Sequence, residues 1–287
     1  MTESALNEIA ESSESDTRQI RFLWEDDAIC VIHKPPRMLV HPRSRRKGHH
    51  EVTVLQRLRE QLLQDVYSVH RLDRATSGVM VCAKSRQAAA ELCRQFRDGE
   101  VVKSYFAVVR GFLDEPIVID RPLNKRSASG RRLDVTVPAV SRLSPRHQYE
   151  LPIPCGRYQT ARCSLIDLHP DTGRWHQLRR HLNHVSHPII GDVEHGDNSQ
   201  NRMYRERFQL RRLLLASTQL RFAHPISGQD MQVTCDPDEE FQEILERLQP
   251  YKITADAVPA WQSSHAGSRV VPPCQSIRNQ SVNRGGN

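Results

Sequence analysis

The sequence predicts an α+β fold in which strands and helices alternate irregularly around a mixed sheet. Short apolar or alternating segments, typical of strands, recur along the chain. Amphipathic segments typical of helices fall between them at uneven intervals, which argues against a regular βαβ repeat. No internal repeat is visible, so a solenoid or propeller is not expected.

The first half of the chain begins with two predicted strands. Residues 20–24 alternate between apolar and polar, and the apolar run 28–33 ends before two prolines that cannot continue a sheet. Thr53 and Gln56 have the spacing of a capping box, which predicts a helix directly after them. The next predicted elements are strands at 66–70, 79–83 and 101–109, and a helix that ends at Gly99.

The second half contains a strongly basic segment. Residues 121–147 carry seven lysines and arginines against one acid, Asp134, and are expected to form a long loop or hairpin. The later predicted elements are strands at 163–168, 213–222 and 231–235, a helix at 175–185, and a last helix with Asp236 as N-cap and Pro237 in its first turn.

The two ends of the chain differ in composition from its body. Residues 1–17 are rich in Ser and Glu and are expected to be disordered. Residues 18–251 are expected to form one folded domain. Residues 252–287 are polar, rich in Pro and Ser and without periodicity, and are expected to be a disordered tail.

Composition excludes several classes of protein. No apolar stretch is long enough to span a bilayer, and the acidic start does not resemble a secretory signal. The seven cysteines are irregularly spaced and form no CxxC pair, which argues against a disulfide framework or a zinc ribbon. These observations predict a cytoplasmic protein with free thiols.

The charge distribution points to a polyanionic partner. The first 17 residues contain five acids and no lysine or arginine, which leaves 41 basic against 29 acidic side chains in the remainder. A folded body this basic is typical of nucleic-acid binding, and a solvated basic surface without a partner is the alternative.

One short segment concentrates groups that could carry chemistry. In HRLDRATSG at 70–78, a single carboxylate, Asp73, lies between Arg71 and Arg74. Nearby positive charge favours the ionised form, which suits a nucleophile or a base. The alternative interpretation is a surface ion-pair cluster.

Two further segments carry candidate residues. In the helix predicted at 175–185, Arg179 borders the apolar face and needs an anion, for which Asp73 is one candidate, whereas a helix with solvent-facing arginines is the alternative. On the strand at 101–109, Tyr105 could stack on a base or be an ordinary core tyrosine.

Metal and cofactor sites are not expected. Five histidines cluster between 176 and 195, but no HExxH motif occurs and no carboxylates complete a ligand set. No GxGxxG or Walker lysine motif is present, so no nucleotide cofactor is expected either.

Four stretches together resemble the RluA-type pseudouridine synthases over roughly residues 20–250. They are HRLDRATSG at 70–78, the segment from His33-Lys34-Pro35 to Leu39-Val40-His41, KSYFAVVRG at 103–111, and TGRWHQLRRHLNHVSHPIIGD at 172–192. The resemblance implies a mixed, largely antiparallel sheet flanked by helices, with the active cleft across its middle. It also implies an RNA-modifying isomerase that uses no metal or cofactor and is a monomer by default.

The resemblance implies roles for individual residues. Asp73 matches the catalytic aspartate, Tyr105 the tyrosine that stacks on the target base, and Arg179 the arginine that pairs with the aspartate. Further substrate-binding residues are expected within the same motifs: Leu178, which lines the base pocket, and Arg71, Arg74, Lys34, His70 and Arg174.

The chain also departs from the family pattern. Ser104 stands where the family often has arginine, and Trp175 where a smaller or basic residue is common. About 20 residues precede the region of resemblance in this sequence, so a separate RNA-binding domain of the S4 type is not expected. RNA binding is therefore expected from basic segments of the domain itself, at 43–47, 121–146 and 202–212.

The resemblance favours a uridine of tRNA near the acceptor stem, with a uridine of large-subunit ribosomal RNA as the alternative. Two other functions remain open. One is an RNA-binding protein of this fold without activity. The other is a hydrolase that cleaves glycosides or nucleosides, although such enzymes usually need two carboxylates.

Overall fold

The computed structural model describes residues 19–42, 51–126, 131–253 and 269–271, and within them one large mixed sheet organises the protein. Its strands follow the spatial order β1-β2-β4-β11-β5-β10-β9-β6-β13, with β3 beside β4 and β12 beside β11. Their bounds are β1 (Arg21–Glu25), β2 (Ile29–Lys34), β3 (Tyr67–Ser68), β4 (Ser77–Ala83), β5 (Val102–Arg110), β6 (Ile117–Asp120), β9 (Val140–Leu151), β10 (Ala161–Pro170), β11 (Leu215–Ala223), β12 (Asp230–Thr234) and β13 (Arg269–Val271).

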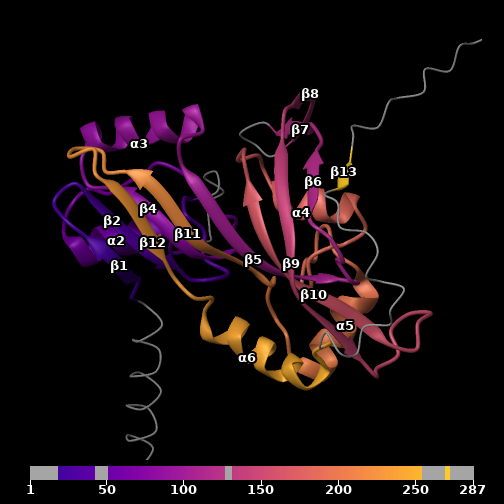
Figure 1. Ribbon diagram of the computed structural model, residues 1–287. Helices are drawn as coiled ribbons and strands as arrows, with labels where there is room; N and C mark the ends of the chain where they lie inside the picture. The colour runs from indigo at the N-terminus through magenta and orange to yellow at the C-terminus, as the bar shows by residue number, and fades with distance from the viewer. Residues whose placement is uncertain (1–18, 43–50, 127–130, 254–268, 272–287) are drawn as a thin grey trace, which may run out of the picture.

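All strand pairs of this sheet are antiparallel except β4 with β11 and β6 with β13. The α+β class and the largely antiparallel sheet are therefore confirmed. Strands β7 (Leu123–Arg126) and β8 (Arg132–Val137) form a separate hairpin that projects at the top of Figure 1.

The helices cover both halves of the sheet. They are α2 (Val54–Leu62), α3 (Arg86–Asp98), α4 (Gln177–His184), α5 (Asn198–Phe208), α6 (Glu239–Leu248) and the 3₁₀ turn η1 (Gln249–Tyr251). Figure 1 shows α2 and α3 with β1, β2 and β4 on the left, α4 and α5 with β9 and β10 on the right, and α6 beneath the junction. Among the helices so described, none has the length and apolar character that crossing a bilayer requires.

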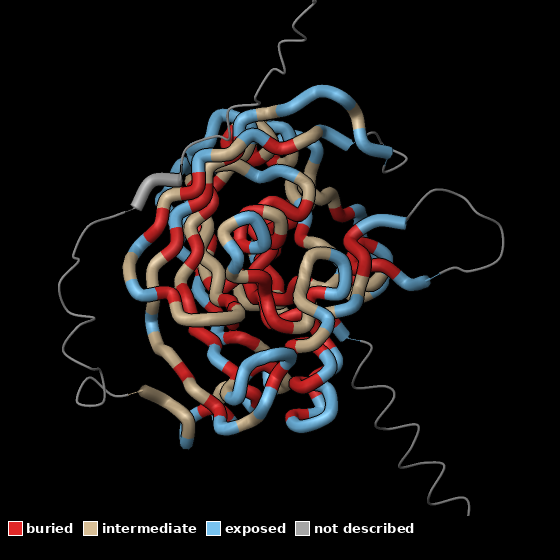
Figure 2. Tube along the Cα trace, turned by 90° about the vertical axis from the view of Figure 1, so that its right-hand side faces the viewer, coloured by how far each residue is buried: buried red, intermediate tan, exposed pale blue. Residues whose placement is uncertain are grey.

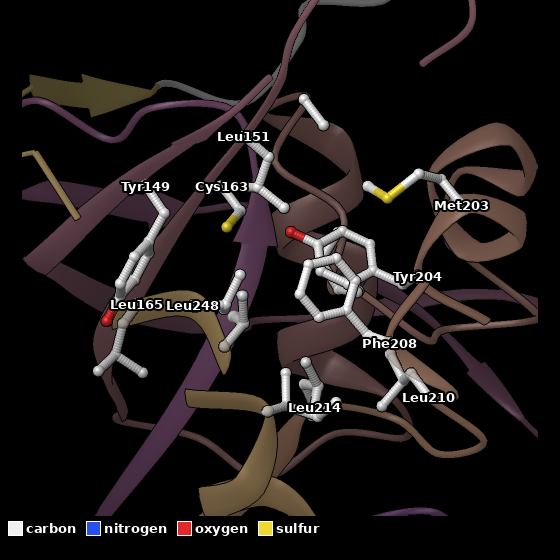
Figure 3. Packing of buried hydrophobic residues seen from close by; sticks show 14 of the residues in the cluster. Tyr149, Leu151, Cys163, Leu165, Met203, Tyr204, Phe208, Leu210, Leu214 and Leu248 are labelled. Carbon is white, nitrogen blue, oxygen red and sulfur yellow. The ribbon is translucent and has the colours of Figure 1, made fainter. Parts of the chain in front are cut away.

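Buried residues, in red in Figure 2, gather toward the centre of the molecule, and many exposed residues, in pale blue, lie at its periphery. Residues of β9, β10, α5 and α6 form one apolar cluster (Figure 3). Tyr149, Tyr204 and Leu248 are fully buried there. Burial of aromatic and aliphatic surface at this density fixes α5 and α6 against the sheet.

Local signals set several element boundaries as expected. The hydroxyl of Thr53 accepts from the Gln56 N–H and the Gln56 side chain accepts from the Thr53 N–H, which completes the capping box of α2. Helix α3 ends at Gly99, which adopts a left-handed φ of 77°.

Other expectations were wrong in extent or position. The strand expected at 66–70 is reduced to Tyr67–Ser68, because the backbone around His70 turns into the loop that follows. The basic segment 121–147 is only partly a hairpin, since residues 140–147 belong to β9 and pair with β10 across the centre of the sheet. The N-cap of α6 is Asp238 rather than Asp236.

Helix α5 was not anticipated, because few of its residues are apolar and its start is marked chiefly by Asp197, whose carboxylate accepts from two backbone N–H groups. The region expected to be a disordered tail contains β13, which pairs in parallel with β6. The expected disorder of residues 1–17 and of most of 252–287 concerns residues outside those described.

The junction of β4 and β11 needs a glycine. Gly78 has a φ of 106°, and a Cβ at this position would lie 1.9 Å from the Ser217 carbonyl oxygen. Only glycine permits both the backbone conformation and the close approach of the two strands. The loop that carries Asp73 leads directly into this junction.

Candidate active site

Asp73 lies at the start of a tight turn that enters β4. The Thr76 N–H donates to the Asp73 carbonyl at 3.0 Å, which closes a four-residue turn. On either side, Leu72 and Thr76 are buried and anchor the loop to the protein interior. The Asp73 side chain retains 20% exposure, so it is sheltered but reachable from the surface.

Arg179 approaches Asp73 from α4. Its Nη1 lies 3.8 Å from Asp73 Oδ2, while Nε and Nη2 form a two-pronged hydrogen bond with both oxygens of Asp192, each at 2.7 Å. Arg179 and Asp192 are both buried. Asp73 is therefore close to Arg179, but the main partner of Arg179 is Asp192, which the sequence analysis did not identify.

The start of α4 is held so that Arg179 faces this site. Gln177 donates to the Val140 carbonyl at 2.8 Å and to the Ser141 hydroxyl at 3.0 Å, which ties α4 to β9. His176 precedes the helix with a left-handed φ of 49°. This conformation turns the chain sharply into α4 and brings the His176 ring over the Asp73 loop.

Tyr105 and Leu178 meet in one apolar cluster. Leu178 is buried in the cluster beneath α4, and Tyr105, on β5, packs against the same cluster. Burial and the negative charge of Asp73 together raise the pKa of Tyr105 well above its usual value. Tyr105 is therefore a neutral phenol near Asp73.

The electrostatics of Asp73 differ from the expectation. Burial raises its pKa, and the opposing effects of Arg179, Arg71 and Lys34 are too weak to reverse the shift. The neighbouring arginines therefore do not make Asp73 an unusually strong acid. They limit the cost of ionising a carboxylate that is sheltered from water.

His176 and His195 extend the network away from Asp73. Arg179 donates to His176 Nε2 at 3.0 Å, so the other ring nitrogen, Nδ1, carries the proton and donates to His195 Nε2 at 3.0 Å. His176 Nε2 also lies 3.7 Å from Asp73 Oδ2. Burial and the charge of Arg179 lower the pKa of His176 to about 3, so its ring is neutral.

The same region contains a group of potential metal ligands. Ligand atoms of His176, Glu194 and His195 lie within 4.8 Å of one another. Both ring nitrogens of His176 are already hydrogen-bonded, and the Arg179 guanidinium, 3.5 Å from Glu194, would repel a cation. Hydrogen bonds account for the cluster, and the absence of a metal requirement stays a prediction.

Lys34 and His70 do not face the site as expected of substrate-binding residues. Lys34 is fully buried and donates to the carbonyls of Pro35, Arg74 and Thr76 at 2.7, 3.3 and 2.8 Å. Its ammonium group thus supports the Asp73 loop from behind, and burial lowers its pKa to about 7. His70 accepts from the Val81 N–H at 3.1 Å and stacks on Phe96, so its role is also to hold the loop.

The three other expected substrate-binding arginines are exposed and lie in different places. Arg71 lies close enough to Asp73 for its charge to lower the Asp73 pKa. Arg74 instead pairs with Glu51 at 2.7 Å. Arg174 donates to the Pro138 carbonyl at 3.0 Å, beside the turn into β9, and no contact joins it to Asp73.

Arg212 supports the same loop from the opposite side of the sheet. Its side chain is fully buried, donates to Ser77 Oγ at 2.8 Å and forms an ion pair with Asp238, the N-cap of α6. Arg212 belongs to the basic segment 202–212, which was expected to bind RNA. Its burial and its pairing with Asp238 exclude that role.

Two open hollows lie away from Asp73. One, of about 540 Å³, lies between α3 and the turn after β11, and the other, of about 350 Å³, lies between α2 and β3. Neither is lined by Asp73, Tyr105 or Arg179. The candidate site is thus separate from both of these hollows.

A sheltered carboxylate near a guanidinium and a neutral tyrosine, on a mixed sheet, is compatible with the RNA-modifying isomerases that the sequence motifs resemble. The family of RNA pseudouridylate synthases matches residues 28–184, more than half of the chain. The chain belongs to this family, and it is an isomerase that converts uridine into pseudouridine.

Curated relatives with high sequence identity to this chain include enzymes described as tRNA pseudouridine synthase C. The chain is 40% identical over 231 residues to tRNA pseudouridine synthase C of Vibrio cholerae, covering 79% of this chain and 94% of the relative. It is 41% identical over 234 residues to tRNA pseudouridine synthase C of Haemophilus influenzae, covering 80% and 98%.

Solved structures agree on the fold. Human RNA pseudouridylate synthase domain containing 4 superposes with a TM-score of 0.62 at 25% identity, covering 82% of this chain and 95% of that protein. Human RNA pseudouridylate synthase domain containing 1 gives the same TM-score at 22% identity, covering 87% and 96%.

Proposed function

We propose that this synthase acts on tRNA, at a uridine near the acceptor stem, with Asp73 as its catalytic carboxylate. The names of the relatives that are about 40% identical over most of both chains support tRNA as the substrate. An enzyme with this substrate works where tRNA matures, in the cytoplasm. The observation that carries the catalytic assignment is Asp73, sheltered 3.8 Å from a buried arginine.

The reaction sets clear demands on the site. The bond between N1 of uracil and C1′ of ribose breaks, the base turns, and a bond between C5 and C1′ forms while the C5 proton is lost. An ionised Asp73 could attack C1′, attack C6 of the base, or remove the C2′ proton, and the geometry is compatible with all three routes. Each route needs a carboxylate in a sheltered position with nearby positive charge.

Tyr105 and Leu178 fit the part of the site that receives the base. The target uridine must leave its stack, which costs a few kcal/mol and is offset by contacts in the protein. A neutral aromatic ring beside an apolar wall supplies such contacts. The raised pKa of Tyr105 favours stacking by the phenol over proton removal by a phenolate.

The direct test uses tRNA transcript that contains 5-tritiated uridine. We expect Asp73→Asn to abolish tritium release while its affinity for the transcript stays within about threefold of wild type, because the substitution keeps the shape of the side chain. Tritium release by the purified variant would refute the assignment. Release of free uracil by the wild type would indicate a hydrolase instead.

The substrate is tested separately. Pseudouridines are mapped in tRNA and ribosomal RNA from cells with and without the gene. Loss of one pseudouridine near the tRNA acceptor stem is expected. Loss of a pseudouridine from large-subunit ribosomal RNA alone would overturn the tRNA proposal and leave the enzyme class intact.

A further inference from the structure

The β7–β8 hairpin and α4 bring four arginines together beside the candidate active site. Arg126 and Arg132 are direct partners across the hairpin, Arg121 precedes β7, and Arg180 lies on α4. Like charges directly opposite each other on paired strands destabilise a hairpin. The arrangement places several positive charges on one side of the hairpin, and a bound anion would stabilise it.

The four guanidinium groups are near enough to affect one another. Burial lowers the pKa of Arg180, and the charges of Arg126, Arg132 and Arg121 lower it further. The hydrogen bonds that Arg180 makes are long, at 3.4 Å to the Asn124 carbonyl and 3.5 Å to the Trp175 carbonyl. Arg180 thus has capacity left to bind an anion.

Three exposed arginines on the neighbouring strands β9 and β10 are each paired with an acid. Arg142 pairs with Asp171 at 3.0 Å, Arg146 with Asp167 at 2.7 Å, and Arg162 with Glu150 at 2.9 Å. In contrast, no ion pair between described residues includes Arg121, Arg132 or Arg180. These three arginines therefore keep their positive charge without an acidic partner among the described residues.

A chain of contacts connects the cluster to Asp73. The Arg126 guanidinium lies 3.9 Å from the centre of the Trp175 ring, and Trp175 stacks on His176 with ring centres 3.6 Å apart. His176 in turn lies 3.7 Å from Asp73. An RNA strand whose target uracil enters the site would thus place the phosphates next to that nucleotide near these arginines.

We propose that Arg121, Arg126, Arg132 and Arg180 bind backbone phosphates of the RNA strand that carries the target uridine. This inference rests on the proposed function. Arginine suits the role because its planar guanidinium can donate two hydrogen bonds to one phosphate. Of the other basic segments expected to bind RNA, 43–47 lies outside the described residues, and 202–212 keeps exposed arginines although its Arg212 is buried. The hairpin is favoured because contacts through Trp175 and His176 connect it to Asp73.

The test measures the salt dependence of binding to unmodified tRNA transcript by fluorescence anisotropy. Arg132→Ala and Arg180→Ala should each weaken binding several-fold at about 0.1 M NaCl. Each should reduce the slope of log affinity against log salt concentration by about 0.7, the value for one single-strand phosphate contact. Arg180→Lys keeps the charge and should retain most of the wild-type slope.

Arg221→Ala is the matched control, because it also removes one positive charge but from an ion pair with Asp230 on β11–β12. It should leave affinity and slope unchanged, and thermal melts should show that all variants are folded. Hairpin variants that bind like Arg221→Ala would overturn the phosphate site. Binding is measured without turnover, so a loss of affinity in the hairpin variants supports the phosphate site whether or not the wild type is active. Absence of tritium release by the wild type would refute only the proposed function.

Discussion

At the scale of single residues, the candidate site is built around Asp73, and nearby positive charges only partly offset the effect of burial on its carboxylate. Arg179 gives its two best hydrogen bonds to Asp192 and meets Asp73 only at 3.8 Å. Asp73 therefore keeps an electrostatic cost of ionisation at neutral pH. Such a cost is common where a side chain is positioned for chemistry rather than for stability.

The raised pKa of Asp73 predicts the pH dependence of turnover. Activity at saturating RNA should rise with pH as Asp73 ionises. The midpoint of this rise, the acid limb of the pH–rate profile, should lie above the ordinary aspartate pKa of 3.8. Arg71→Ala removes a charge that lowers the Asp73 pKa, so the limb should move to higher pH. A pH–rate profile checks this, with Arg221→Ala as the control. A limb that moves to lower pH would contradict the assignment.

The same pKa shift predicts the effect of Asp73→Asn on stability. The folded state favours the protonated Asp73 carboxyl, because the Asp73 pKa is higher in the folded than in the unfolded protein. The contribution of Asp73 to the free energy of unfolding is therefore fully present below the unfolded-state pKa of about 3.8 and is lost as pH rises through the folded-state pKa. At pH 7 the neutral amide should therefore raise Tm relative to wild type. Calorimetry at pH 7 and at pH 3 measures the difference, which should shrink at the lower pH.

Asp192 is predicted to be essential for structure. Burial raises its pKa, but hydrogen bonds from Arg179 and from the backbone of His195 and Glu194 outweigh this and lower it overall. Asp192→Asn would leave the buried Arg179 with only the more distant carboxylates of Asp73, at 3.8 Å, and Glu194, at 3.5 Å, at a cost of roughly 3–5 kcal/mol. Urea unfolding measures this cost. The exposed neighbour Glu194→Gln, as a control, should change stability little.

Local sequence singles out some residues of the candidate site, whereas residues held there by tertiary contacts give no such signal. Asp73 is marked by its two flanking arginines and Gly78. Its pKa direction was misjudged because burial cannot be read from adjacent charges. Asp192 was missed because it lies 13 residues after Arg179, beyond the end of α4. No helical or strand periodicity therefore relates the two residues.

At the scale of elements, the catalytic loop depends on the contact between β4 and β11. Gly78→Ala would place a methyl group 1.9 Å from the Ser217 carbonyl and impose a left-handed conformation on alanine. The conformation alone costs about 1–3 kcal/mol, and separation of the strands adds to it. We expect a large loss of both Tm and turnover.

Gly228 provides the control for this substitution. It also has a positive φ, 73°, but no atom lies within 4 Å of the position of its Cβ. Gly228→Ala should therefore cost about 1 kcal/mol and leave turnover unchanged. Equal effects of the two substitutions would show that the approach of β4 to β11 is not the cause.

Elements were predicted well where capping or periodicity was strong, as for α2, with its Thr53 capping box, and α3, with Gly99 at its end. They were predicted poorly where tertiary context decides. Residues 140–147 read as a basic loop because Arg142 and Arg146 interrupt the apolar pattern, yet both arginines pair with acids of neighbouring segments and the strand continues. Helix α5 has too narrow an apolar face to be recognised from periodicity alone.

At the scale of the whole molecule, α6 connects the two halves of the protein behind the active site. Asp238 caps α6 and pairs with buried Arg212, which holds Ser77 of the catalytic loop. Asp238→Ala removes the N-cap of α6 and leaves the buried Arg212 guanidinium without its ion-pair partner. It should therefore destabilise the protein by roughly 3–5 kcal/mol. Chemical denaturation measures the loss.

The exposed ion pair between Arg37 and Glu240 offers a comparison on the same helix. Arg37→Ala breaks this surface contact and should change stability little. If both variants were equally stable, Asp238 would not brace the loop. If Asp238→Ala also lowered turnover at temperatures where it stays folded, the brace would act on Asp73 as well as on global stability.

The pairing of Ser77 with Arg212 joins residues 135 positions apart in the chain. During synthesis, Asp73 leaves the ribosome long before β11 and α6, and the contacts that shape its loop cannot form until those segments emerge. Contacts so distant in sequence form late in folding because closing the intervening chain is entropically costly. A nascent or prematurely terminated chain therefore exposes basic surface to cellular RNA without the ability to modify it, and activity should begin only once translation has passed α6.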